Sequence, residues 1–234
     1  MFHDAIPEEA APDRILTFVF ARHASFGAFA TEDPRSPGSG GGGFYDPAGL
    51  LAFHLEVRGG AEALDRVVRV EATHAYLHAH VTRPGVTLPP WLEEGLAEYV
   101  ATSDVENGRI IPRASPRRRA TGRASHARSL GEPPRADAAQ VASAVRSGNA
   151  IPLDRLLDAR PEELLGEPAR LFPAQSWLWV HFLRHGKPEW QDGAFPSLVL
   201  YMAEGYPPAD VFPAVYGSSA AGLAAGFREY AKRF

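Results

Sequence analysis

The longest regular pattern in the chain runs from Ala61 to about Val81 and predicts a long helix. Apolar side chains recur along it every three or four residues, which is the spacing of one helical face. They are Leu64, Val67, Val68, Ala72, Ala75 and Leu77. No side chain suited to capping precedes the pattern. A helix of this length needs a surface to cover, so the fold has to supply one from neighbouring segments.

Two apolar segments upstream provide that surface. Residues 14–21, RILTFVFA, are rich in apolar and β-branched residues and predict a buried strand. A short helical piece follows around ASFGAFA, and then a flexible glycine loop at residues 36–43. After a turn at Asp46-Pro47, a second strand is expected from about Leu50 to Val57. The two strands are predicted to share a small sheet over the long helix.

The remainder of the chain predicts helices. WLEEGLAEYVAT, from Trp91 to Thr102, restarts a helix that is entered through Pro89-Pro90. Further helical segments are separated by Gly and Pro. We therefore expect an α+β fold forming a single domain over residues 1–234. Its parts are an N-terminal α/β lobe at 1–103, a basic surface loop at 104–136 and a helical lobe at 137–234, with a candidate cleft between the lobes.

The composition of the chain limits which metal ligands, membrane spans and export signals it can contain. The chain of 234 residues contains no Cys, so any metal must be bound by His, Asp and Glu. No apolar run is long enough to cross a bilayer, and a membrane span is not expected. The acidic N-terminus lacks the features of a secretory signal, which predicts a cytoplasmic protein, or an exported one if a signal has been removed. The pattern indicates no oligomeric state.

Charge is unevenly distributed along the chain. Residues 109–135 hold eight Arg and one Glu, a balance of +7, so a net charge of −4 leaves −11 for the remainder. Clustered Arg can bind the phosphates of nucleic acids through counterion release. This segment has no interleaved aromatic residues and no nucleic-acid-binding fold around it. A solvated loop is the preferred interpretation, and nucleic-acid binding is an unlikely alternative.

The sequence VEATHAYLHAH, residues 70–80, carries the candidate chemistry. On an ideal helix Glu71, His74 and His78 fall within a sector of about 60°, so they project from one face. Such a face can bind a metal, although histidines on a helix are more often ordinary surface or packing residues. In the zinc motif H-E-x-x-H, Glu71 and His74 would be the Glu and the second His, but Val70 stands where the first His belongs.

A second helix supplies carboxylates to complete such a site. WLEEGLAEY carries Glu93, Glu94 and Glu98. A carboxylate from another helix is how a two-histidine zinc site reaches three protein ligands while keeping a position open for water.

Together these elements resemble the gluzincin zinc metallopeptidases, and in particular a bacterial group of peptidase MA-like domains with a pattern close to H-E-x-T-H followed by W-L-x-E-G-L-A-E-Y. The likeness also takes in GGFYDP, PLDRLL, AQSWLWVHFL and AAGFREYAKRF, and so covers most of the chain. It implies a zincin-like fold with His74 as the second zinc ligand, Glu71 as the general base and Glu94 as the third ligand. Val70 falls on the first ligand and cannot coordinate zinc.

A second departure from the family concerns the oxyanion. Related sequences tend to carry a Tyr just before the AQSW helix, whereas this chain has Phe172-Pro173, neither of which can donate a side-chain hydrogen bond. Tyr45 or Tyr201 are possible replacements. The resemblance thus implies a peptidase-like protein in which hydrolysis is lost or weak.

Two alternatives stay open beside this hypothesis. In a rearranged active site, His78 replaces the missing ligand, so that His74, His78 and Glu94 bind zinc and Glu71 remains the base. Alternatively, Glu71 and His74 chelate a metal at i, i+3 spacing. In either case a peptide or protein is the expected ligand, held along an edge strand of the sheet, for which the strand near Leu50 to Val57 is the candidate.

Overall fold

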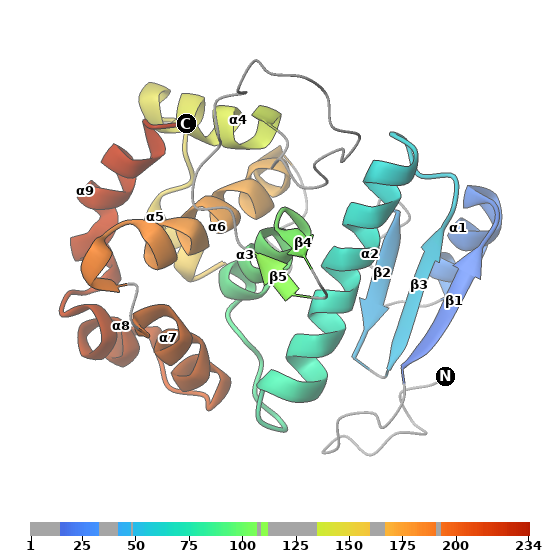
Figure 1. Ribbon diagram of the computed structural model, residues 1–234, viewed down its shortest axis with the longest axis horizontal. Helices are drawn as coiled ribbons and strands as arrows, with labels where there is room; N and C mark the ends of the chain where they lie inside the picture. The colour runs from blue at the N-terminus through green and yellow to red at the C-terminus, as the bar shows by residue number, and fades with distance from the viewer. Residues whose placement is uncertain are drawn as a thin grey trace. The chain divides into compact units, whose positions relative to one another are not determined.

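The structure is a computed structural model (Figure 1) that describes residues 15–32, 42–47, 49–106, 109–111, 135–159, 167–190 and 193–234. It has an α+β fold, as predicted, with a small sheet and a mainly helical remainder. The chain divides into two compact units. Unit 1 is Met1–Thr87 and unit 2 is Leu88–Phe234. The helix that carries Glu94 therefore belongs to unit 2.

Unit 1 contains a sheet of three strands in the order β1-β3-β2. β1 (Leu16–Phe20) runs parallel to β3 (Leu50–His54), and β2 (Gly43–Asp46) runs antiparallel to it. The expected sharing of one sheet by the first two predicted strands is confirmed. The sequence did not predict β2, because a strand of four residues that begins with Gly is too short to show an alternating pattern.

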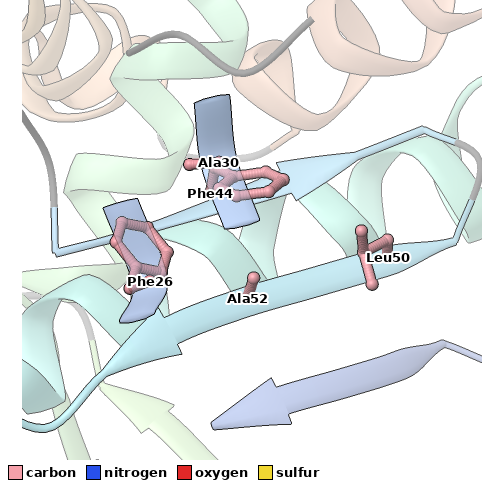
Figure 2. Close-up of a cluster of buried hydrophobic side chains, with 5 residues drawn as sticks. All are labelled: Phe26, Ala30, Phe44, Leu50 and Ala52. Carbon is pink, nitrogen blue, oxygen red and sulfur yellow. The ribbon is translucent and has the colours of Figure 1, made fainter. Parts of the chain in front are cut away.

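One face of the sheet packs on α1 (His23–Glu32), the short helix expected around ASFGAFA. Figure 2 shows the side chains between them, which come from α1, β2 and β3 and are almost fully buried. They are Phe26, Ala30, Phe44, Leu50 and Ala52. These residues form a hydrophobic core in unit 1, in which Phe44 of β2 lies opposite Ala52 of β3.

The other face of the sheet is covered by α2 (Ala61–Tyr76), the long helix (Figure 1). α2 contacts β2 and β3. The approach is close at Gly43, where an added Cβ would lie 3.0 Å from Val67 Cγ1 and 2.8 Å from the Ala52 carbonyl oxygen. The predicted helix is confirmed and has no side-chain cap at Gly60. Its last turn differs from the prediction, because η2 (Leu77–Val81) is a π-helix.

β1 corrects the prediction of a buried strand. Leu16 and Val19 each expose more than half of their surface, 53% and 54% respectively. β1 lies at an edge of the sheet, and the contacts of α2 are made with β2 and β3. The apolar composition that suggested burial therefore belongs to an edge strand with side chains exposed on both faces.

Unit 2 is built around the packing of α3 (Pro90–Ala101) against α6 (Glu167–His185). α3 begins at the predicted prolines, with Pro89 as the residue before its first turn. α6 begins earlier than expected, so Pro173 lies inside the helix. The remaining elements are β4 (Asp104–Glu106), β5 (Arg109–Ile111), α4 (Arg135–Ser147), α5 (Leu153–Leu157), η4 (Pro188–Trp190), α7 (Ala194–Ala203), α8 (Pro208–Tyr216) and α9 (Ala220–Ala231).

The helices predicted after residue 136 are confirmed in unit 2. Within the predicted loop at 104–136, the structure describes the β4–β5 hairpin and the start of α4. The Arg-rich stretch from 112 to 134 lies outside the described residues. In the part of the chain that the structure describes, no helix combines the length and apolarity needed to cross a membrane.

Candidate functional site

α2 holds Glu71 and His74 on a regular stretch of helix. Three residues apart, they point in directions about 60° from each other, and both side chains are partly exposed. An ion pair between Asp65 and Arg69, 2.8 Å long at i, i+4 spacing, stabilises the preceding turn. The pairing of a carboxylate with an imidazole on one face therefore follows from the sequence as expected. Each of the two also interacts with neighbouring groups.

Val70 occupies the position before Glu71 and is half-buried. Its isopropyl side chain has no lone pair to offer a metal. Zinc in catalytic sites takes three protein ligands from N, O or S donors, so this position supplies none. The helix therefore carries the Glu and the second His of the H-E-x-x-H pattern but not its first His.

His78 lies on the π-helix η2, just after the regular helix. A π-helical turn holds more residues than an α-helical turn, so the ideal α-helical spacing used to predict the face of His78 does not apply beyond Tyr76. The turn is closed by Thr82, whose backbone N–H donates to the Leu77 carbonyl at 2.9 Å and whose hydroxyl donates to the His78 carbonyl at 3.1 Å. π-helical turns are rare, and many occur at functional sites. His80, on the same turn, is exposed.

The His78 ring is fixed by Tyr45 of β2. The phenolic oxygen lies 3.1 Å from Nδ1 of His78. Two hydrogen-bond arrangements satisfy this geometry: the phenol donates to an unprotonated Nδ1, or Nδ1–H donates to the phenol. In the second, Nε2 keeps its lone pair and can bind a cation, as in metal sites where one ring nitrogen is held by a hydrogen bond and the other coordinates.

Glu94 lies on α3 of unit 2 and is partly exposed. α3 is anchored by Trp91 and Leu92, both fully buried, so the positions of its glutamates along the helix are set by the core of unit 2. Glu98, one turn further on, is 8% exposed. Glu94 and His74 belong to different units.

Zinc is the metal that the resemblance implies, and a catalytic zinc site requires three protein ligands. Among the residues that the structure describes, no group of three or more His, Asp or Glu side chains could hold a metal ion. Glu71, His74 and His78 therefore do not form a three-ligand site by themselves. A zinc site at α2 would need a further ligand.

The two tyrosines considered as oxyanion donors belong to different units, Tyr45 to unit 1 and Tyr201 to unit 2. Phe172 is 3% exposed and Pro173 continues α6, so this segment serves the core of unit 2. Tyr201 lies on α7 of unit 2, is 47% exposed and packs edge-on against Tyr206. Tyr45 is the one that the structure brings to a candidate ligand, His78.

Unit 2 contains a cluster of His and Tyr side chains. His181 is 2% exposed, and its Nδ1 lies 2.7 Å from the Tyr230 hydroxyl. Nε2 of His185 lies 2.7 Å from the Tyr99 hydroxyl. Burial, together with the nearby His181 and Arg184, lowers the pKa of His185 to about 4. His185 is therefore neutral at pH 7, and both histidines pack among aromatic rings.

A histidine pair in unit 1 was not predicted, because its members are far apart in the sequence. Nδ1 of His23, at the start of α1, lies 3.2 Å from Nε2 of His54, at the end of β3. The carboxylate of Glu56 accepts a hydrogen bond from the His23 backbone N–H at 2.9 Å. His54 is 4% exposed, and burial, followed by the charge of His23, lowers its pKa.

Comparison with known proteins does not identify a function for these residues. No protein-family model, curated protein or solved structure matches the chain. The functional argument therefore rests on the residues and their arrangement.

Proposed function

We propose that this chain is a gluzincin-like protein that binds peptides and has lost or strongly weakened zinc-dependent hydrolysis. The observation that carries this proposal is Val70, which stands at the first zinc-ligand position directly before Glu71 and His74. Two features of unit 1 support a zincin-like origin. They are a small sheet covered by one long helix and the location of Glu71 and His74 on that helix.

The chemical reason is the loss of a ligand from the metal. In the zinc hydrolases the metal lowers the pKa of a bound water to about 7, and a nearby carboxylate removes its proton. Two protein ligands hold zinc much less tightly than three. Without the metal, Glu71 has no acidic water to deprotonate, and hydrolysis loses its nucleophile.

Peptide binding is assigned to the edge of the sheet. The strand near Leu50 to Val57 was the predicted binding strand, but β3 pairs on both sides, with β1 and with β2, so its backbone is already used. The edge strands are β1 and β2. Of these, β2 packs on α2 and carries Tyr45, whose hydroxyl contacts His78. We place the peptide along β2, where main-chain hydrogen bonds would extend the sheet.

The experiment compares binding with turnover. The protein is loaded with zinc, its metal content is measured, and it is then incubated with a broad peptide library. The proposal predicts less than one zinc per chain after removal of free metal, retention of a subset of peptides and no cleavage. Robust cleavage that is removed by a chelator would contradict the proposal.

The second candidate is an active hydrolase with a rearranged site, in which His74, His78 and Glu94 bind zinc. The hydrogen bond between Tyr45 and His78 favours it, because this contact orients the imidazole and leaves Nε2 for a cation when Nδ1 is protonated. In that site Glu71 would remain the base, one turn before its usual position relative to the two histidines.

His78→Ala tests the second candidate, with His80→Ala as the matched control from the same turn. The candidate predicts that His78→Ala weakens zinc binding by at least about tenfold and that Tyr45→Phe weakens it by a smaller factor, since partners of metal-ligating histidines contribute about 10- to 100-fold. His80→Ala should leave the affinity unchanged. Equal zinc affinity in wild type and His78→Ala excludes the rearranged site.

A further inference from the structure

β1 presents an edge of the sheet that the described residues leave unpaired. On its inner side the Leu16 N–H donates to the Gly49 carbonyl at 2.8 Å, and the Leu55 N–H donates to the Phe20 carbonyl at 2.9 Å. Backbone groups alternate in direction along a strand, so those of Thr17 and Val19 point away from β3. As far as the described residues show, this edge is a row of hydrogen-bonding groups with which another strand can pair.

The edge lacks the features by which proteins prevent strand pairing. β1 is LTFVF, without a charged residue, a Pro or a Gly. Natural edge strands are commonly protected by an inward-pointing charge, especially Lys, by Pro or by a bulge. A bare edge of β-branched and aromatic residues is instead favourable for pairing.

Apolar side chains surround the edge on both faces of the sheet. Pairing with β3 puts Leu16 and Phe18 on the same face as Leu50 and Ala52, which is the face of α1, and Val19 on the opposite face. The exposed members are Ile15 (36%), Leu16 (53%), Phe18 (39%), Val19 (54%) and Leu55 (53%). A strand added here would need apolar side chains on both of its faces to cover them.

We propose that a second copy of this chain pairs through β1, giving one continuous six-stranded sheet across a two-fold axis. A strand that covers β1 needs apolar side chains on both faces, and the β1 strand of a second copy has them. In an antiparallel arrangement centred on Phe18, Thr17 lies opposite Val19 of the second copy. Both residues turn their backbone groups toward the partner, and the two symmetric pairs form four hydrogen bonds.

The exposed area indicates a weak dimer. With roughly 150 Å² for each of these apolar side chains, the five exposed fractions amount to about 350 Å² per copy. Stable interfaces bury about 800 Å² per partner. The dimer should therefore dissociate on dilution, and its population should depend on protein concentration. This surface is on the opposite edge of the sheet from the strand assigned to peptide binding, and it does not depend on that assignment.

Thr17→Pro removes an outward N–H that β3 does not use, so it tests the edge directly. Thr17→Val is the matched control, because it keeps that N–H. Sedimentation equilibrium over a wide concentration range should show a reversible monomer–dimer equilibrium in wild type and in Thr17→Val. The dissociation constant of the Thr17→Pro dimer should be at least about tenfold higher, because one hydrogen bond is lost from each of the two copies.

Val19→Lys provides a second variant that keeps the backbone intact and places like charges at the dimer axis. Leu200→Lys is its control, because Leu200 is 62% exposed on α7 of unit 2 and does not belong to a strand. Val19→Lys should be monomeric at concentrations where Leu200→Lys and wild type form dimers, with circular dichroism confirming that each variant is folded. A wild-type protein that is monomeric at every concentration overturns the proposal. A dimer that persists in folded Val19→Lys does the same.

Discussion

At the scale of single residues, burial shifts the pKa values of His185 and Tyr99 in unit 2 so that both groups stay neutral near pH 7. His185 sits between Tyr99, His181 and Arg184, and its surroundings disfavour a second positive charge. The neutral ring bonds to the Tyr99 hydroxyl, and burial raises the pKa of that hydroxyl above its usual value. The result is a pair of groups that keep their protons fixed across the physiological range and serve packing.

A pH-dependent loss of stability follows from His185. Its pKa is about 4 in the folded protein and near 6.5 in the unfolded chain. The unfolded state therefore binds the proton first as the pH falls, so the free energy of unfolding decreases between about pH 6.5 and 4. The shift corresponds to at most about 3.4 kcal/mol, and the partial exposure of the ring reduces this contribution. Urea unfolding at several pH values should show a flatter profile for His185→Gln than for wild type. Parallel profiles would contradict the assignment.

At the scale of secondary-structure elements, Gly95 shows why a motif residue can be structural. An added Cβ at this position would lie 2.7 Å from the Ser176 carbonyl oxygen and 2.6 Å from Val180 Cγ2. α3 and α6 approach this closely only because no side chain intervenes. The Gly of WLEEGLAEY is therefore explained by helix packing, whatever the role of the neighbouring Glu94.

Gly95→Ala should destabilise the protein, although Ala is the better helix former by about 1 kcal/mol. Forcing α3 away from α6 costs roughly 1 to 3 kcal/mol, and thermal unfolding should show a lower melting temperature. Gly226→Ala on α9 is the matched control. Its Cβ would be 3.3 Å from Phe182 Cζ, a side-chain atom with room to move, so stability should be unchanged or slightly higher. If the two variants behave alike, close packing is not the reason for Gly95.

Long periodic segments were predictable from sequence, and short or context-dependent ones were not. α2, α3 and the later helices have the spacing and the Pro or Gly boundaries that define helices. β2 is too short to show a pattern, and the π-helix at Leu77–Val81 has no known signature in sequence. The exposure of β1 depends on which strands α2 covers, so its apolar composition wrongly suggested burial.

For the candidate site, the sequence predicted which residues lie together on α2, but it could not predict which side chains from other elements contact them. Glu71 and His74 follow from helical spacing alone. The contact between Tyr45 and His78 joins residues separated by 33 positions, and it arises from the packing of β2 on the helix. The same is true of His23 and His54, which meet because α1 begins beside the end of β3.

At the scale of the whole molecule, charge is concentrated in the Arg-rich segment. Residues 109–135 carry +7 against −11 elsewhere, and most of this segment lies outside the described residues. If this segment is the solvated loop that the sequence predicts, it should bind nucleic acid weakly, because the negative charge of the remaining residues opposes the phosphates. We expect no retention on DNA at about 150 mM salt, and we expect deletion of residues 113–128 to leave stability and peptide binding unchanged. Retention that the deletion abolishes would revive the nucleic-acid-binding alternative.

The proposed loss of the first zinc ligand can be tested on the whole protein. If the chain is a gluzincin-like protein that lacks one ligand, restoring that ligand should restore the metal. Val70→Ala is the control for the loss of the isopropyl group. Combining Val70→His with Glu94→Gln tests the carboxylate ligand, because the double variant should lose what the single variant gains.

The most direct test is a zinc titration of wild type and Val70→His with a competing chelator. Three protein ligands define a zinc site of the hydrolase type. We therefore expect one zinc per chain in Val70→His, bound at least about 100-fold more tightly than in wild type, with the gain abolished by Glu94→Gln. A folded Val70→His protein with no higher zinc affinity than wild type would contradict the account, as would wild-type protein that already binds one zinc as tightly.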